Sequence, residues 1–144
     1  MPDKVFLDSN LWIYLFLTSS KNEDIIKKTK VKNLLTNYPD VVISNQVLNE
    51  ISNVLLRKYK IDNDTVEKHL RKLLNIVELY LLDDNNTFDA LSLLKQYNLS
   101  FYDALIISAA IDANCNTLFS EDMQDGLKIE NKLTIINPFK KAET

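Results

Sequence analysis

Hydrophobic positions follow two alternating patterns along the chain. Short apolar runs of strand length alternate with longer stretches in which apolar residues recur with the period of a helix. The runs predict strands at residues 5–7, 41–43, 76–82, 117–119 and 133–136. The longer stretches predict helices at residues 23–37, 45–58, 64–74, 87–97 and 102–113. Such alternation predicts an α/β fold whose largely parallel sheet is covered by helices on both faces.

The length and composition predict a single domain over residues 1–144. The chain is 46% hydrophobic and 26% charged, which is typical of one globular domain with one core. A single glycine and three prolines leave no room for a flexible linker. We therefore expect continuous structure from Val5 to about Phe139.

The apolar stretch at residues 5–17 resembles neither a signal peptide nor a membrane span. Asp8 and Asn10 interrupt it, and its longest pure run covers only residues 11–17. The single cysteine, Cys115, lies in an apolar segment and cannot form an internal disulfide, so we expect a buried, inert thiol. These features predict a cytoplasmic protein without a membrane partner.

Charge is unevenly distributed along the chain. The net charge of −3 and the pI near 5.2 argue against a protein that coats nucleic acid through bulk electrostatics. Between Lys27 and Lys72, however, ten Lys or Arg face five acids, whereas residues 73–126 carry one base and nine acids. This asymmetry fits a basic rim around an acidic centre, although lysines at helical spacing are also typical of ordinary solvated surface. The only arginines, Arg57 and Arg71, are candidates for contacts with RNA phosphates.

Several kinds of active site are excluded by what the sequence lacks. The only histidine, His69, lies beside Lys68 on a predicted helix, where a surface position is expected. One histidine cannot support a two-histidine ribonuclease, and it leaves a zinc site without its usual ligands. No nucleophile-elbow motif is present, and the only glycine, Gly126, cannot form a glycine-rich phosphate loop. Carboxylates remain as the groups able to carry chemistry.

Two candidate acids lie in the first half of the chain. Asp8 ends the first strand, and since Ser9 and Asn10 are better placed to cap the next helix, we expect Asp8 to be free. Glu50 shares the apolar stripe of the helix at residues 45–58. A glutamate at the edge of such a stripe can also simply reach water along its stem.

Two further candidates lie in the second half. Asp103 opens the most apolar helix, but Ser100 and Asp103 also match a capping box, which would explain the pair without chemistry. Asp122 follows the strand at residues 117–119, and acids after a capping Ser120 have an ordinary explanation in the helix dipole. None of the four acids is specific alone.

Together, the four acids indicate a metal site. Hard divalent cations prefer oxygen ligands, and like charges clustered in a cleft are otherwise costly to fold. A pair of ions roughly 3.5 to 4 Å apart can hold a phosphodiester and activate the attacking water without histidine. The pattern therefore predicts metal-dependent phosphodiester hydrolysis.

Four sequence blocks resemble those of the PIN-domain nucleases, and among them the VapC-type toxins of toxin–antitoxin systems. The blocks are Phe-Leu-Asp-Ser-Asn ending at Asn10, Asn-Glu-Ile around Glu50, Ser-Phe-Tyr-Asp-Ala-Leu-Ile around Asp103, and Leu-Phe-Ser-Glu-Asp-Met-Gln-Asp-Gly around Asp122, the last followed by Ile-Asn-Pro-Phe ending at Phe139. Their order and spacing agree with the family over almost the whole chain.

The resemblance implies a three-layer α/β/α domain, a Mg²⁺ or Mn²⁺ cofactor, cleavage of single-stranded or structured RNA, a homodimer and a cognate antitoxin. It also implies roles for individual residues. The metal ligands and catalytic acids would be Asp8, Glu50, Asp103 and Asp122, with Asn10 and Ser120 as polar supports. The fourth block varies most in such proteins, so Glu121 and Asp125 are alternatives to Asp122.

Two other classes remain open at this stage. A haloacid dehalogenase-type phosphatase also carries an aspartate after its first strand, but it requires a second aspartate where this chain has Asn10. A catalytically inactive PIN-fold module that binds RNA or protein would be expected to lack one or more acids, and the first three are all present. A cleavage assay distinguishes this module from a nuclease.

Overall fold

A computed structural model describes residues 3–140 of the chain, and its centre is a six-stranded sheet in the order β3-β2-β1-β4-β6-β5. All neighbouring strands are parallel except β5, which is antiparallel to β6. The strands are β1 (Lys4–Leu7), β2 (Asp40–Ser44), β3 (Glu78–Tyr80), β4 (Thr117–Phe119), β5 (Lys128–Ile129) and β6 (Leu133–Ile136).

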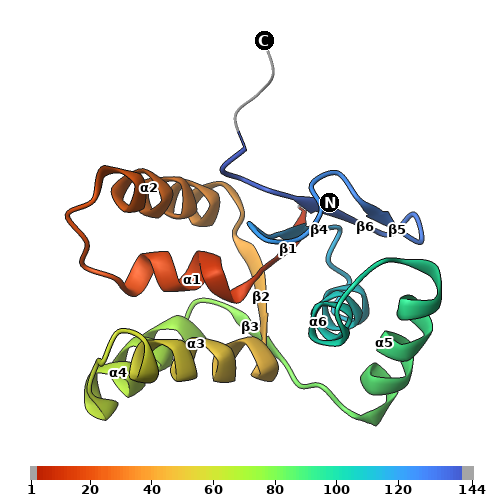
Figure 1. The fold of residues 1–144 in the computed structure, drawn as a ribbon, viewed down its shortest axis with the longest axis horizontal. Coiled ribbons are helices and arrows are strands. Elements are labelled where there is room, and N and C mark those ends of the chain that lie inside the picture. The colour runs from red at the N-terminus through yellow and green to blue at the C-terminus, as the bar shows by residue number, and fades with distance from the viewer. Residues whose placement is uncertain (1–2, 141–144) are drawn as a thin grey trace.

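Helices cover both faces of this sheet, which gives the three layers of an α/β/α domain (Figure 1). The helices are α1 (Ser9–Phe16), α2 (Asn22–Asn37), α3 (Asn45–Arg57), α4 (Asn63–Leu74), α5 (Asp84–Gln96) and α6 (Phe101–Asp112). Helices α5 and α6 pack together on one side, and α1 packs against both α2 and α3 on the other. The expected fold class is confirmed.

The core lies between the central strands and the helices that cover them. Strand β1 is buried from Val5 to Leu7, and α6 is buried around most of its circumference. Trp12, the largest fully buried side chain, anchors α1 to the same core. Because the central strands are covered on both faces, they are continuous apolar runs without alternation.

The strand order reverses at β1. From β1 the chain continues through β2 to β3 on one side, and β4 then lies on the other side of β1. In open α/β sheets a ligand crevice forms at such a switch point, beyond the carboxyl ends of the strands. The loops after β1 and β4 therefore border the expected binding position.

Most predicted elements are observed, with two shifted boundaries. The predicted strand at residues 76–82 is reduced to β3, because α4 ends in a turn in which the Ile76 N–H donates to Leu73 O. Helix α5 begins at Asp84, before the predicted start at residue 87, because Asp83 and Asn86 form a reciprocal capping box. In both cases local hydrogen bonds rather than hydrophobic period set the boundary.

Two elements were not predicted. Helix α1 is buried through Leu11, Trp12 and Ile13, and the unbroken apolar run after its first two residues hides the helical period. Strand β5 contributes only two residues to the sheet and pairs with β6 across a turn in which Glu130 and Asn131 have positive φ. A strand this short carries no detectable period.

Two expectations about the environment of the chain can be compared with the fold. Within residues 3–140, no helix is long and apolar enough to cross a membrane. Cys115 is buried, and burial raises the pKa of its thiol to about 12. The thiol is therefore inert, as expected.

Candidate active site

Asp8 lies at the carboxyl end of β1 and is only 6% exposed. Its Oδ1 accepts a 2.7 Å hydrogen bond from the Ser9 N–H, and its Oδ2 accepts a 2.8 Å bond from the buried hydroxyl of Ser120 after β4. Asp8 is thus the N-cap of α1, and the expectation that it has no capping role is wrong. The reason is that α1 begins at Ser9, so that the residue with extended backbone before it, not Ser9 or Asn10, is the cap.

Glu50 extends from the middle of α3 toward the same region. It is half-buried, and its Oε1 is a buried atom without a hydrogen-bond partner among the described residues. Burial, followed by the charges of Asp8 and Asp103, raises the pKa of Glu50 to about 7. An unpartnered buried oxygen on an acid is costly unless a proton, water or cation satisfies it.

Asp103 lies in the first turn of α6, close to the other acids. Ser100 is the N-cap of this helix, and its hydroxyl accepts a 3.1 Å bond from the Asp103 N–H. Burial and the charge of Asp122 raise the pKa of Asp103, although a polar contact with Ser100 opposes the shift. The Ser100 hydroxyl caps the helix through the backbone of Asp103, so this cap does not require the Asp103 carboxylate.

Asp122 is the exposed member of the group, in the loop after β4. Its Oδ2 accepts a 3.0 Å hydrogen bond from the side-chain amide of Asn10 in the first turn of α1. The Oδ1 of Asn10 is buried and has no partner among the described residues. The loops after β1 and β4 are therefore joined by two polar contacts, Asn10–Asp122 and Ser120–Asp8.

Each of the buried or half-buried acids Asp8, Glu50 and Asp103 lies within electrostatic range of at least one other of the four acids. Burial raises the pKa of Asp8 in spite of its hydrogen bonds, and the charges of Asp103 and Asp122 add to that rise. Glu50 in turn is affected by Asp8 and Asp103. Like charges gathered in a partly buried cleft favour protonation or the binding of a cation.

The donor chemistry of this cleft fits a hard divalent cation. Within residues 3–140, no three acidic, histidine or cysteine side chains are arranged to hold a metal ion by themselves. Mg²⁺, however, keeps several waters and typically uses only one or two protein carboxylates. The unpartnered Oε1 of Glu50 and Oδ1 of Asn10 supply further oxygens for the ion or its waters.

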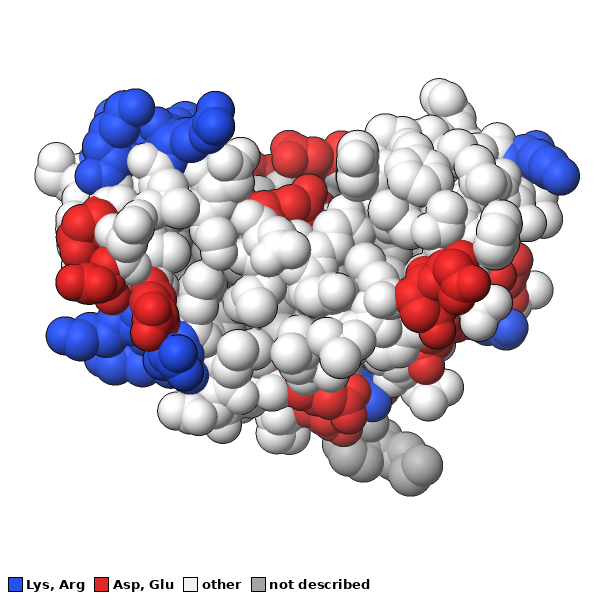
Figure 2. All heavy atoms as spheres, turned by 90° about the horizontal axis from the view of Figure 1, so that it is seen from below, with Lys and Arg blue, Asp and Glu red and all other residues white. Residues whose placement is uncertain are grey.

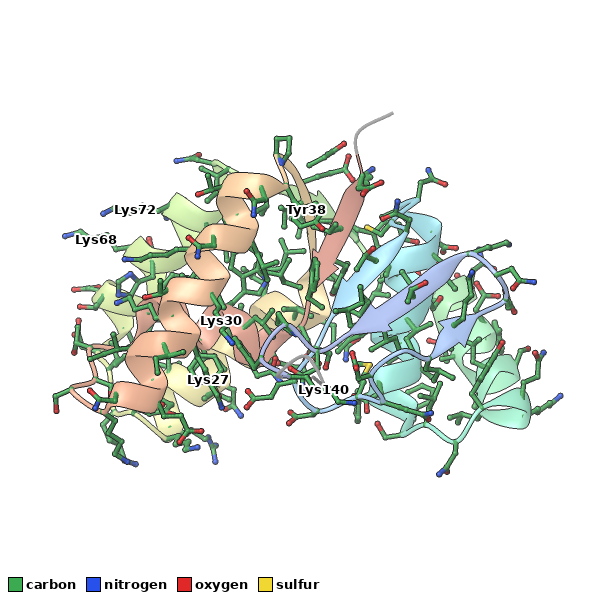
Figure 3. All side chains as sticks on the ribbon, turned by 90° about the horizontal axis from the view of Figure 1, so that it is seen from above. Lys27, Lys30, Tyr38, Lys68, Lys72 and Lys140 are labelled. Atoms are coloured by element: carbon green, nitrogen blue, oxygen red, sulfur yellow. The ribbon has the colours of Figure 1, made fainter. Side chains whose placement is uncertain are left out.

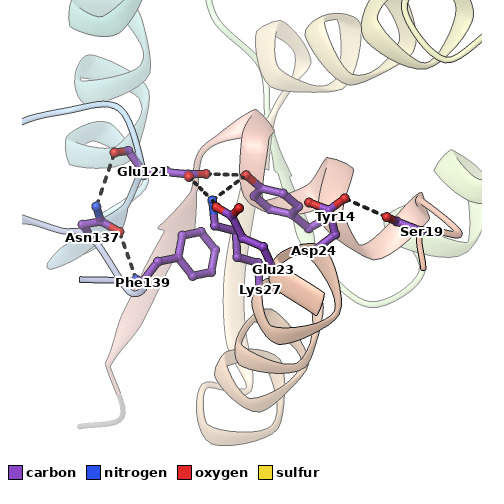
Figure 4. A network of polar contacts seen from close by, with 8 residues as sticks. All are labelled: Tyr14, Ser19, Glu23, Asp24, Lys27, Glu121, Asn137 and Phe139. Carbon is purple, nitrogen blue, oxygen red and sulfur yellow. Dashed lines mark hydrogen bonds and ion pairs between the residues drawn. The ribbon is translucent and has the colours of Figure 1, made fainter. Parts of the chain in front are cut away.

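The two alternatives to Asp122 are occupied elsewhere. Glu121 accepts a 2.7 Å bond from the Tyr14 hydroxyl and forms an ion pair with Lys27 (Figure 4). Asp125 accepts a 2.8 Å bond from the Asn137 N–H, which lowers its pKa. Both carboxylates support the loop after β4.

Basic residues gather over one half of the molecule. Figure 2 shows two groups of Lys and Arg at one edge, with Asp and Glu in a hollow between the two halves. Figure 3 shows Lys68 and Lys72 projecting from α4, far from Lys27 and Lys140. On the face drawn in Figure 2, the larger basic groups therefore lie to one side of the acidic hollow.

The two arginines have different surroundings. Arg57 is exposed in the last turn of α3, the helix that carries Glu50. Arg71 is exposed on α4, and its Nε donates a 2.8 Å bond to Glu67 one turn earlier. His69 on α4 is half-buried, with its ring 4.9 Å from that of Phe16, so it is packed against a helix and not fully on the surface.

Sequence reasoning missed a groove beside Glu50. It has a volume of about 530 Å³, and its lining includes Gln46, Asn49, Asn53 and Tyr102. The only signal for it in the sequence was a tyrosine, Tyr102, immediately before Asp103. In the sequence, the amide side chains of α3 are typical of an ordinary exposed helix surface. They become part of a groove only because Tyr102 of α6 lies beside them.

A known protein family matches the part of the chain that carries these acids. The family model described as PIN domain matches residues 5–125, which include all four acids. The chain belongs to the PIN-domain family. No curated protein matches the chain in sequence.

Solved structures share the PIN fold at low sequence identity. A chain of a toxin–antitoxin complex from Klebsiella pneumoniae is 20% identical, with a TM-score of 0.70 over 96% of this chain and 100% of that one. VapC20 of Mycobacterium tuberculosis, a toxin that cleaves the sarcin–ricin loop, is 20% identical, with a TM-score of 0.65 over 83% of this chain and 92% of that one. A chain of VapBC2 from Rickettsia felis, bound to a DNA fragment from its promoter, is 21% identical. Its TM-score is 0.62 over 91% of this chain and 96% of that one.

Proposed function

We propose that this PIN-domain protein is a metal-dependent endoribonuclease that hydrolyses phosphodiester bonds of single-stranded or structured RNA. The observation that carries the proposal is the placement of Asp8, Glu50 and Asp103 near the switch point of the sheet, where burial and neighbouring acids raise their pKa values, with Asp122 joined to the same position through Asn10. Mg²⁺ or Mn²⁺ bound there would lower the pKa of an attacking water and stabilise the charge that develops on the phosphate.

The residues of the chain have separate roles in this proposal. Asp8, fixed by Ser9 and Ser120, supplies a carboxylate of defined orientation. Asn10 holds the exposed carboxylate of Asp122 toward the same loop junction. Such contacts orient metal ligands and reduce the entropy lost when the ion binds.

Asp122 is favoured as the fourth acid because its alternatives are engaged. The Glu121 carboxylate is neutralised by Lys27 and bonded by Tyr14, and Asp125 holds the chain at Asn137. A carboxylate already paired with an ammonium group is a poor competitor for a cation.

We further propose that the protein is the toxin of a toxin–antitoxin pair, forms a homodimer and acts in the cytoplasm. Two of the similar folds come from complexes described as toxin–antitoxin or VapBC, and a third is described as a toxin that cleaves the sarcin–ricin loop. Because the structural match extends over nearly the whole of those chains, it supports the proposal that this chain is also a toxin. Co-purification with the product of an adjacent reading frame tests the antitoxin, and light scattering tests the dimer.

A PIN-fold module that binds RNA or protein without cleaving it is the alternative. The two functions are separated by incubating the purified protein with labelled single-stranded and hairpin RNA in EDTA, Mg²⁺ and Mn²⁺. We expect cleavage only with metal, and its loss in Asp103→Asn but not in the control Asp125→Asn. If the wild type cleaves no RNA with either ion, or if Asp103→Asn cleaves normally, the nuclease proposal is wrong.

A further inference from the structure

The groove beside Glu50 is lined mainly by neutral side chains. Apart from Glu50, its polar groups are neutral amides, and Tyr102 and Leu82 complete the lining. The amides belong to Asn45, Gln46, Asn49 and Asn53. Glu50 is the only charged residue in the lining. A phosphate would be repelled there, whereas a neutral planar group with hydrogen-bonding edges fits both the amides and the ring.

Tyr102 is held as an exposed platform next to the acids. The residue is 65% exposed, although it directly precedes Asp103 in α6. Its backbone carbonyl accepts a 3.1 Å bond from the Gln46 amide, and its ring centroid lies 5.6 Å from that of Phe101. The backbone beneath the ring is therefore fixed to α3. A large exposed aromatic side chain in such a place is typical of a surface on which a base stacks.

The amides belong to a polar stripe on α3. Gln46, Glu50, Asn53 and Arg57 recur at spacings of four, three and four residues and so share one face of the helix, with Asn49 beside them. Asn49 and Asn53 are exposed, and the Oε1 of Gln46 is buried without a partner among the described residues. From Glu50 to Arg57 the stripe extends about 10 Å at 1.5 Å per residue.

We propose that this groove binds one unstacked base of a single-stranded RNA next to the scissile phosphate. The base stacks on Tyr102, Asn49 and Asn53 bond its edge, and Arg57 contacts a phosphate farther along the strand. Amide side chains pair bidentately with adenine, so adenine is the expected base. This inference rests on the proposed ribonuclease function and names the substrate feature that the site selects.

The test measures binding separately from cleavage. Fluorescently labelled 2′-O-methyl oligonucleotides of A, U or C, which lack the 2′-hydroxyl, are titrated by anisotropy with the full chain in EDTA and in Ca²⁺. Tyr102→Ala should weaken binding of the A oligonucleotide about tenfold or more, the loss expected for one stacked base. Tyr102→Phe should bind like wild type, as should Phe88→Ala, which removes an exposed aromatic from α5 outside the groove.

Base preference tests the amide of Asn53, whereas the salt dependence of binding tests Arg57. Asn53→Ala should reduce the preference for A over U and C without changing the salt dependence. Arg57→Gln should keep the preference but lower the salt slope by about 0.7, the value for one phosphate contact of a single strand. Lys95→Gln, which removes an exposed positive charge from α5 outside the groove lining, is the matched control.

The outcomes separate this inference from the proposed function. If Tyr102→Ala and Asn53→Ala bind every oligonucleotide like wild type, or if the wild type binds none of them, the groove does not hold a base and the inference is wrong. The inference also fails if Tyr102→Ala loses binding to a partner protein but not to RNA. If the groove variants behave as expected while the wild type cleaves no RNA with Mg²⁺ or Mn²⁺, the base site stands and the nuclease proposal fails.

Discussion

The Ser120 hydroxyl donates a 2.8 Å hydrogen bond to Oδ2 of Asp8, although the two residues are 112 positions apart. Ser120 is fully buried, and its oxygen also accepts a 3.3 Å bond from the Met123 N–H. One hydroxyl thus orients the carboxylate after β1 and begins the turn after β4. Because β1 and β4 are neighbours at the switch point, this contact sets the geometry of the acid cleft.

Removing that hydroxyl should weaken metal binding. Ser120→Ala leaves Asp8 Oδ2 without its donor, and loss of a group that orients a ligand typically lowers metal affinity about 10- to 100-fold. Ser120→Thr keeps the hydroxyl and should bind Mn²⁺ nearly as wild type does. Calorimetric titration with Mn²⁺ measures both. Equal affinities for Ser120→Ala and wild type would show that Asp8 is not a ligand.

Substitutions of Asp8 should separate its capping role from its charge. Asn is as good an N-cap as Asp, whereas Ala loses the cap at a cost of about 1 kcal/mol. In EDTA, Asp8→Asn should melt at or above the temperature of wild type, since a buried charge near two other acids is removed. Asp8→Ala should melt below Asp8→Asn.

In excess Mn²⁺ the wild type should melt above Asp8→Asn, which is the reverse of the order expected in EDTA. Ligand at a hundredfold excess over Kd stabilises the wild type by about 2.7 kcal/mol, which corresponds to several degrees in Tm for a domain of this size. Asp8→Asn should gain clearly less. Thermal melts at fixed pH and ionic strength provide the comparison, and identical Mn²⁺ shifts in the two proteins would remove Asp8 from the site.

The stability of the metal-free protein should depend on pH through Glu50. Its pKa is raised from 4.5 to about 7 in the fold, first by burial. A raised acid pKa means that the folded state holds the proton more tightly than the unfolded state. The stabilisation is therefore complete below about 4.5 and is lost as the pH rises toward 7.

Urea unfolding in EDTA across this pH range measures the effect. The free energy of unfolding should fall as the pH rises, and the fall should be smaller in Glu50→Gln, which carries no titrating proton. Mn²⁺ affinity of the wild type should rise over the same range, because metal and proton compete for the carboxylate. A Glu50→Gln profile that matches wild type would show that Glu50 titrates normally.

Asp122 and Glu121 should differ in their effect on metal binding. Asp122→Asn removes a charge that couples to Asp8 and Asp103, so Mn²⁺ binding should weaken. Glu121→Gln removes a carboxylate already paired with Lys27, so it should reduce stability and leave Mn²⁺ affinity unchanged. The reverse pattern in a Mn²⁺ titration would make Glu121 the fourth acid.

Asn86 should matter for stability alone. It is 0% exposed, its amide donates 2.9 Å bonds to Ser108 and Asp112, and its Oδ1 accepts a 3.0 Å bond from the Asp83 N–H. Asn86→Ala leaves these partners without their hydrogen bonds. It should lower the free energy of unfolding measured in urea by about 2 kcal/mol or more, with Mn²⁺ affinity unchanged. Asn85→Ala, at an exposed position of the same helix, should be near neutral.

The alternation of elements was predictable because the hydrophobic period of a buried strand or an amphipathic helix is local information. The positions after β1 and β4 and along α3 and α6 therefore identified Asp8, Asp122, Glu50 and Asp103 as candidates from the sequence. Helix α1 was hidden because its residues are apolar on nearly every side, and β5 because two residues have no period.

The sequence by itself determined which residue types stand at the ends of strands and on buried faces, and thus the α/β class and the carboxylate chemistry. Only the tertiary structure decided that Ser120 bonds to Asp8, that Glu121 faces Lys27, and that Tyr102 closes a groove on α3. The physical reason is distance along the chain. A hydrogen bond or a shared groove between residues 56 to 112 positions apart depends on strand order and helix packing, which no local period encodes.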